Sequence, residues 1–86
     1  MLTKNITVDL PANQEARPVA MIVQVASRYD SNVHMVSGNI RANVKSIMGM
    51  MAFGLKNGMD VVVTAEGSDE AAALEAVANQ LTSATA

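Results

Sequence analysis

Hydrophobic and polar positions alternate along the first ten residues of the chain. The two sets divide by parity, with apolar side chains at Leu2, Ile6, Val8 and Leu10 and polar ones at Thr3, Asn5, Thr7 and Asp9. A period of two predicts a strand with one buried face. After Pro11 the spacing becomes helical, with an apolar stripe at Val19, Ile22, Val23 and Ala26. Pro18 is tolerated only in a first helical turn, so this helix should begin near residues 15–17.

The rest of the pattern predicts a hairpin, a short helix, a strand and a last helix. In chain order these are strands at 33–36 and 40–44 around the turn Ser37-Gly38-Asn39, a helix at 47–55 capped by Ser46, a strand at 60–66, and a final helix capped by Ser68. The final helix has its apolar stripe at Leu74, Val77, Ala78 and Leu81. The order βαββαβα predicts an α+β fold in which helices cover one face of an antiparallel sheet.

Composition narrows the class of protein. With 86 residues, we expect a single domain over residues 1–86. Half of the residues are hydrophobic and only 2% are aromatic, which predicts an aliphatic, methionine-rich core. A net charge of −2 with scattered bases gives no electrostatic reason to bind nucleic acid directly. The chain has no cysteine and no apolar run near the roughly 20 residues that span a membrane, so we expect a cytoplasmic protein without a membrane partner.

The stretch Gln14-Glu15-Ala16-Arg17-Pro18 places an acid and a base where the first helix should begin. The free N–H groups and the dipole of a helix start attract anions. The guanidinium of Arg17 adds donors suited to carboxylate or phosphate. Glu15 could occupy that anion position itself, or it could simply be a first-turn acid that stabilises the helix by about 0.3–1 kcal/mol.

A second feature is the stretch Lys45-Ser46-Ile47-Met48-Gly49-Met50-Met51. Met50 and Phe53 are spaced to face the core. Ile47, Met48 and Met51 cannot all face the same way, so some of these three residues should form an exposed apolar patch beside Ser46. Exposed apolar patches mark partner surfaces, and methionine adapts well to partners. A phosphate on Ser46 would suit its capping position. The alternative is an ordinary capping serine with core methionines.

Other catalytic or metal-binding patterns are missing from the sequence. His34 is the only histidine, and on a strand without neighbouring ligands it fits a surface or half-buried side chain better than a base. No catalytic triad order, glycine-rich phosphate loop or metal-ligand cluster is present. We therefore expect a protein that is not an enzyme and that needs neither a cofactor nor a metal.

Taken together, Ala16-Arg17-Pro18 and Lys45-Ser46-Ile47-Met48-Gly49 resemble the HPr family, the small phosphocarriers of the bacterial sugar phosphotransferase system. The resemblance covers nearly the whole chain. It implies an HPr-like open-faced β-sandwich, with a four-stranded antiparallel sheet covered on one face by three helices. In the family, a histidine just before Ala-Arg-Pro carries the phosphate, and here that position is Glu15.

The missing histidine and the intact serine segment make the chain similar to the catabolite repression HPr (Crh) group. This resemblance implies phosphorylation of Ser46 by an HPr kinase/phosphorylase, followed by action as a corepressor of a LacI-type catabolite control repressor. Arg17 would hold the phosphate or contact the repressor, Lys45 would flank the kinase site, and Ile47, Met48 and Met51 would supply apolar contacts.

Two alternatives remain open at this point. Glu15 could accept phosphate from Enzyme I, which would make the chain a phosphotransferase component. Glu15 could instead act as a constitutive mimic, because its permanent charge stands where a phosphohistidine would carry nearly −2. The sequence fits either a monomer or a homodimer.

Overall fold

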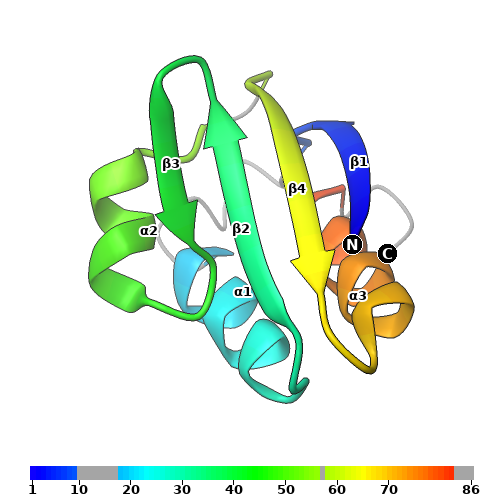
Figure 1. Ribbon diagram of the computed structural model, residues 1–86. Coiled ribbons are helices and arrows are strands. Elements are labelled where there is room, and N and C mark those ends of the chain that lie inside the picture. Colours follow the sequence, from blue (N-terminus) through cyan, green and yellow to red (C-terminus); the bar gives the residue numbers. More distant parts are fainter. Residues whose placement is uncertain (10–17, 57, 83–86) are drawn as a thin grey trace.

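The computed structural model describes residues 1–9, 18–56 and 58–82. Its elements follow the predicted order (Figure 1): β1 (Leu2–Thr7), α1 (Pro18–Ser27), β2 (Asn32–Ser37), β3 (Ile40–Asn43), α2 (Ile47–Phe53), β4 (Asp60–Glu66) and α3 (Glu70–Leu81). None of the helices in these ranges is long and apolar enough to cross a membrane.

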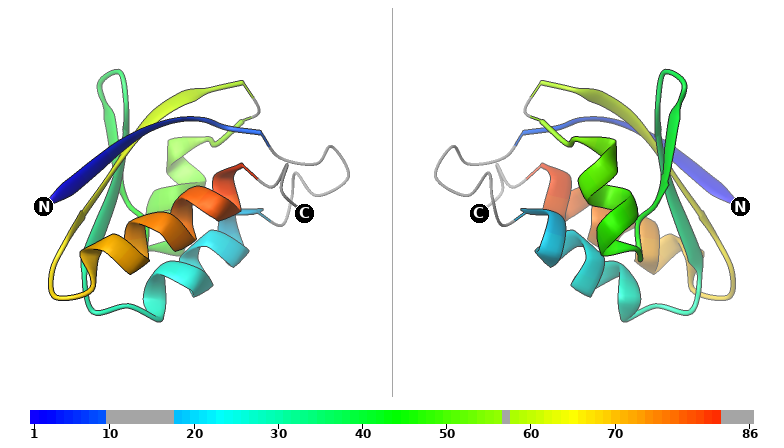
Figure 2. Two further views of the ribbon diagram at one scale, coloured as in Figure 1. Left: turned by 90° about the vertical axis from the view of Figure 1, so that its right-hand side faces the viewer. Right: turned by 90° about the vertical axis from the view of Figure 1, so that its left-hand side faces the viewer.

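The four strands form one antiparallel sheet in the order β1-β4-β2-β3. Its register aligns residues of the same face across neighbouring strands: Ile6 lies opposite Val61, and Met35 lies opposite both Val63 and Ala42. The helices lie on one side of the sheet, and the other side stays open (Figures 1 and 2). This arrangement confirms the predicted α+β open-faced sandwich.

The core lies between the sheet and the helices, where the predicted apolar faces of the strands and helices pack together. Along β4, Val61, Val63 and Ala65 are buried, while the residues between them face the open side. The stripe of α1 is buried at Ile22, Val23 and Ala26, with Val19 packed partly against the core. The α3 stripe is buried as predicted, at Leu74, Val77, Ala78 and Leu81.

Three local predictions are corrected by the structure. The N-cap of α3 is Asp69 and not Ser68, because Gly67, Ser68 and Asp69 form a turn closed by the Glu70 N–H on the Gly67 carbonyl (3.3 Å). Helix α2 ends at Phe53 and not at Leu55, since Gly54 turns the chain into the left-handed region with φ 73°. Leu2 is 40% exposed and does not join the buried face of β1.

The position of α2 is fixed at its start and along its buried side. At its start, the chain leaves β3 through Val44, which is fully buried and donates its N–H to the Val33 carbonyl (2.9 Å). Met50 and Phe53 then insert into the core. The helix packs against both β3 and α1, so its opposite side is left at the surface.

Candidate functional site

Ser46 is the N-cap of α2, as predicted. Its backbone is extended (φ −106°, ψ 117°), and its Oγ accepts the Gly49 N–H at 3.1 Å. The Ser46 N–H donates to the Asn43 carbonyl, and the Ser46 carbonyl accepts the Met50 N–H, both at 2.9 Å. Three hydrogen bonds therefore fix the backbone and the side-chain direction of a half-buried serine.

Gly49 keeps the space beside this hydroxyl open. A Cβ at position 49 would lie 3.3 Å from Ser46 Oγ and 3.4 Å from Ser46 Cβ. A contact of 3.3 Å is tighter than most real Cβ contacts, so a larger residue at position 49 would press on the serine side chain. Glycine in the first turn of α2 thus favours access to Ser46 at some loss of helix propensity.

The exposed side of α2 is apolar. Ile47, Met48 and Met51 are 51%, 83% and 67% exposed, while Met50, on the other side, is fully buried. Spacings of three and four residues put these exposed side chains on neighbouring parts of the helix surface. We call this set, Ile47, Met48 and Met51, the α2 apolar face. It begins directly after Ser46, as the sequence predicted.

Lys45 has a structural contact that the sequence did not reveal. Its Nζ donates to the Tyr29 carbonyl at 2.7 Å, just past the C-terminal end of α1. A cation is favourable at this end of a helix dipole. The Lys45 N–H also donates to Asn43 Oδ1 at 2.9 Å, which tightens the turn before Ser46. Lys45 therefore links the start of α2 to the exit of α1.

The two predicted residues before the first helix, Glu15 and Arg17, lie outside the described residues. Helix α1 is described from Pro18 onward, which agrees with a proline in the first turn. The predicted start near residues 15–17 also falls outside the described part. The structure thus brings together Lys45, Ser46 and the α2 apolar face.

The sequence did not predict the hydrogen bonds that the Asp69 carboxylate accepts at the start of α3. Asp69 accepts the N–H groups of Asp30 and Ser31, both at 2.9 Å, and the hydroxyl of the fully buried Ser31. The Ser31 hydroxyl, followed by the Asp30 N–H, holds the pKa of the Asp69 carboxyl below its ordinary value. This hydrogen-bond network joins the α1–β2 turn to α3, and none of its described hydrogen bonds involves Ser46, so we assign it a structural role.

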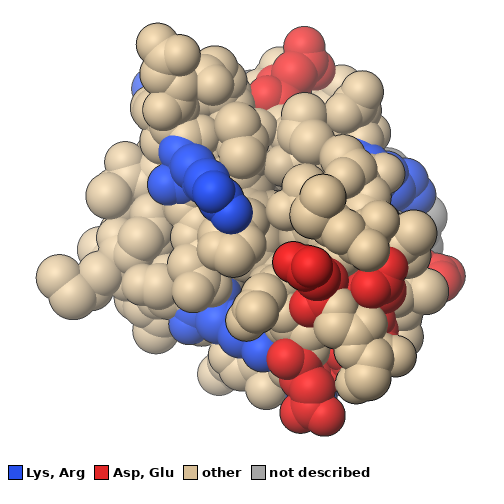
Figure 3. Space-filling model, viewed as in Figure 1, with Lys and Arg blue, Asp and Glu red and all other residues tan. Residues whose placement is uncertain are grey.

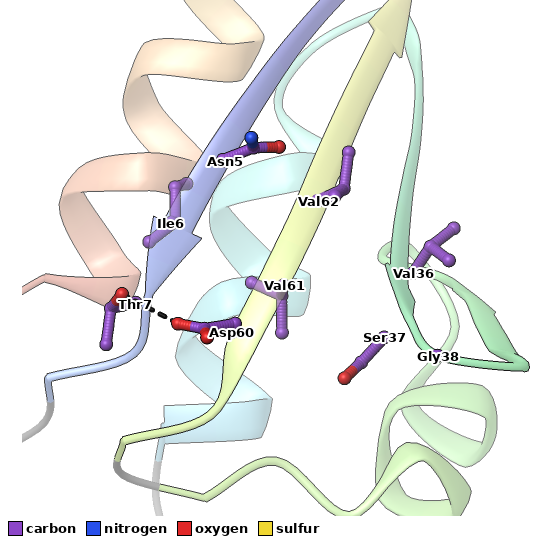
Figure 4. Close-up of a pocket in the computed structure, with 9 residues that line it drawn as sticks. All are labelled: Asn5, Ile6, Thr7, Val36, Ser37, Gly38, Asp60, Val61 and Val62. Atoms are coloured by element: carbon purple, nitrogen blue, oxygen red, sulfur yellow. Dashed lines mark hydrogen bonds between the residues drawn. The ribbon is translucent and has the colours of Figure 1, made fainter.

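A hollow of about 490 Å³ lies where β2 and β4 separate. Figure 4 shows its lining side chains, with Thr7 donating to Asp60 Oδ1 at 2.8 Å on one side. Its described lining residues are Asn5, Ile6, Thr7, Val36, Ser37, Gly38, Asp60, Val61 and Val62. The predicted site residues that the structure describes, Lys45, Ser46 and those of the α2 apolar face, do not line it.

Charge is distributed without a continuous basic surface on the face shown in Figure 3. Acidic side chains gather there over the end of β4 and the start of α3, the region that contains Glu66, Asp69 and Glu70. Within the described ranges, no three histidine or carboxylate side chains are grouped so that they could hold a metal ion. His34 is half-buried on β2.

Comparison with known proteins identifies the family. A family model described as "PTS HPr component phosphorylation site" matches residues 2–83. The chain belongs to the HPr family. Its relatives include the phosphocarrier protein HPr of Treponema pallidum (strain Nichols), 47% identical over 77 residues that cover 90% of this chain and 88% of that protein. HPr proteins are phosphoryl carriers and not enzymes.

Solved structures of the family share the fold. The HPr of Bacillus anthracis str. Ames superposes with a TM-score of 0.87 at 36% identity, covering 94% of this chain and 96% of that one. Crh, the catabolite repression HPr of Bacillus subtilis, superposes with a TM-score of 0.72 at 37% identity, covering 94% and 93%. The crystal structure of Crh is described as an intertwined, swapped dimer.

Proposed function

We propose that this HPr-family chain is a Crh-like regulator of carbon catabolite repression. In this proposal an HPr kinase/phosphorylase phosphorylates Ser46, and the phosphorylated protein acts as corepressor of a LacI-type catabolite control repressor. The observation that carries the proposal is Ser46 at the head of α2, fixed by hydrogen bonds and followed at once by the α2 apolar face. The likeness in fold to Crh supports it.

The geometry of Ser46 suits a phosphoryl acceptor. Its Oγ uses a lone pair to accept the Gly49 N–H, so this bond does not consume the hydroxyl proton that phosphorylation must remove. In the transfer, Oγ forms a bond to the γ-phosphorus of ATP, the bond from that phosphorus to ADP breaks, and the hydroxyl proton leaves. The phosphate would then carry nearly −2 at the start of α2.

The surroundings of Ser46 suit a protein partner. The α2 apolar face presents three side chains that are each at least half exposed, and burying them against a partner would be favourable. Arg17 would supply guanidinium hydrogen bonds to the phosphate or to the repressor. Lys45 would flank the kinase site, although its ammonium is bound to the Tyr29 carbonyl in the unphosphorylated chain.

Phosphorylation by a purified HPr kinase/phosphorylase with radiolabelled ATP tests the proposal. We expect one phosphate, located on Ser46 by peptide mass spectrometry, and no label on Ser46→Ala. Ser27→Ala is the matched control, because the Ser27 hydroxyl donates to the Val23 carbonyl (2.7 Å) inside α1 and its loss should leave labelling unchanged. An unlabelled wild-type protein beside a labelled Crh would refute the proposal.

A second candidate function is favoured by the family match itself, since the Treponema pallidum relative is named a phosphocarrier. In that case Glu15 would accept the phosphoryl group of phospho-Enzyme I and form an acyl phosphate. Phosphoenolpyruvate and Enzyme I should then label the chain, and the label should be lost in Glu15→Gln. No transfer under conditions that label a true HPr would exclude this function.

The mimic hypothesis needs a separate comparison. If Glu15 imitates phosphohistidine by its charge, a partner of phospho-HPr should bind the wild type more tightly than Glu15→Gln. Equal affinities of the two proteins would remove the mimicry. Homodimer formation, supported by the swapped Crh dimer, is tested by sedimentation equilibrium on the same preparations.

A further inference from the structure

We propose that Met48 and Met51 form a paired, reversible oxidation site that controls the α2 apolar face. The argument begins with the distribution of methionine between the core and the surface. Met48 and Met51 are 83% and 67% exposed, whereas Met35 and Met50 are fully buried. One short helix thus carries both oxidant-accessible and protected thioethers.

The two exposed thioethers are not required by the fold. Helix α2 is held by Met50 and Phe53, which insert into the core. Leucine at positions 48 and 51 would give similar apolar area and equal helix propensity. The property that methionine adds here, besides flexibility, is a sulfur that small oxidants can reach.

The modification is a two-electron oxidation with a named oxidant, a hydroperoxide such as hydrogen peroxide. A thioether lone pair attacks the terminal peroxide oxygen, an S–O bond forms and the O–O bond breaks. The sulfur is oxidised to the sulfoxide, and hydrogen peroxide is reduced to water. Methionine sulfoxide reductases return the thioether.

Oxidation should make the α2 apolar face more polar and leave the core unchanged. A sulfoxide oxygen is a strong hydrogen-bond acceptor, and its burial against an apolar partner without a donor is unfavourable. Each buried sulfoxide should weaken partner binding roughly tenfold or more. The fold should persist because Met35 and Met50 are shielded from solvent.

Partial oxidation of the native protein provides the first test. After brief treatment with hydrogen peroxide and quenching with free methionine, peptide mass spectrometry should show Met48 and Met51 oxidising at least about tenfold faster than Met35 and Met50, as expected for exposed against buried thioethers. The thermal unfolding midpoint should stay unchanged. Comparable oxidation rates of Met48 and Met50 in the folded protein would overturn the proposal.

The second test measures the hydrophobicity of the protein surface in the absence of any partner. Oxidised protein should elute earlier from a phenyl hydrophobic-interaction column, and methionine sulfoxide reductases A and B should restore the original retention. The double variant Met48→Leu/Met51→Leu should shift much less than wild type after peroxide, with a remainder from the exposed Met1 and Met21. Met21→Leu, a change at a 48% exposed site on α1, should keep most of the wild-type shift. A double variant that responds as strongly as wild type would contradict the assignment.

The effect on a partner rests on the proposed function and is measured separately. Peroxide should reduce phosphorylation of the wild type by the kinase about tenfold or more per buried sulfoxide and leave the double leucine variant unaffected. An untreated wild type that is not phosphorylated would refute the proposed function alone, and the oxidation rates and column retention would still decide the oxidation site. Undiminished phosphorylation of fully oxidised wild type would refute control of the kinase contact.

Discussion

Replacement of Ser46 by alanine should destabilise the fold as well as remove the proposed phosphate acceptor. The Ser46 Oγ accepts the Gly49 N–H at 3.1 Å, and alanine leaves that first-turn donor without its cap. Loss of an N-cap serine costs about 1 kcal/mol. The site is half-buried, so water replaces the lost acceptor only in part and a value near this figure is expected.

The assay is urea unfolding followed by circular dichroism at 222 nm, with a thermal scan alongside. A loss of about 1 kcal/mol corresponds to a fall of roughly 4–8 °C in Tm for a domain of this size. Ser46→Asp keeps a capping acceptor and should stay within about 0.5 kcal/mol of wild type. Ser27→Ala, which removes a hydroxyl inside α1, should also change stability by less than about 0.5 kcal/mol.

Two results would refute this reasoning. One is a Ser46→Ala variant whose midpoint and slope match those of wild type, because the hydroxyl would then not act as a cap. The other is Ser46→Asp losing as much stability as Ser46→Ala, because the loss would then not come from the acceptor. The measurement also serves the kinase assay, since it shows whether an unlabelled Ser46→Ala is folded at the assay temperature.

Three further predictions concern the residues that hold the fold around α2 and α3. Because its pKa is lowered, the Asp69 carboxylate stabilises the fold at neutral pH, and this contribution is lost as the pH falls from the ordinary value of 3.8 through the lowered pKa. The variant Asp69→Asn should therefore be less stable than wild type at pH 7. In urea unfolding below about pH 5, its stability should depend less on pH than that of wild type. Gly67→Ala should lower the free energy of unfolding by at least about 2 kcal/mol, because Gly67 has φ 152° and a Cβ there would lie 2.7 Å from Ser31 Cα. An unfolding midpoint equal to that of wild type would contradict this prediction, because the backbone would then have moved to remove the contact at little cost. Met50→Ala should lower the free energy of unfolding by about 2–5 kcal/mol, because it opens a cavity in the core. Met48→Ala, at an 83% exposed position, should change it by less than about 0.5 kcal/mol. Calorimetry measures both variants, and equal losses of stability would contradict the buried and exposed sides assigned to α2.

The parts of the fold that could be predicted from the sequence are those in which buried apolar residues recur at regular spacing along the chain. Strand β4 has the predicted bounds, Asp60–Glu66, because a β-branched run flanked by polar residues and turns has no competing helical period. The buried side of α2 was predicted correctly, because Met50 and Phe53 lie three residues apart and are both buried. Local periodicity is sufficient for such features. The exposed side is larger than expected, because Ile47, Met48 and Met51 are all exposed and the sequence predicted only some of them there.

The features that were missed depend on contacts between distant parts of the chain. Asp69 bonds to Ser31, which is 38 residues away, and no local pattern predicts that an acid beside a good capping serine will turn toward another loop. The same limit applies to Lys45, whose ammonium donates to the Tyr29 carbonyl, whereas the family resemblance implied only that Lys45 flanks the kinase site. These polar contacts arise from the packing of the helices and cannot be derived from spacing.

Helix α2 holds its core contacts and its proposed phosphoryl acceptor through different residues. The core contacts of α2 come from Met50 and Phe53, while Ser46 depends on Gly49 and on the turn from Asn43. None of these contacts requires a histidine at the start of the first helix. Under the proposed function, Glu15 takes the place of the family histidine, and the described contacts of Ser46 and of the α2 apolar face do not involve that position. Under the proposed function, changes of chemistry on the exposed side of α2 should therefore affect partner binding and leave stability unchanged.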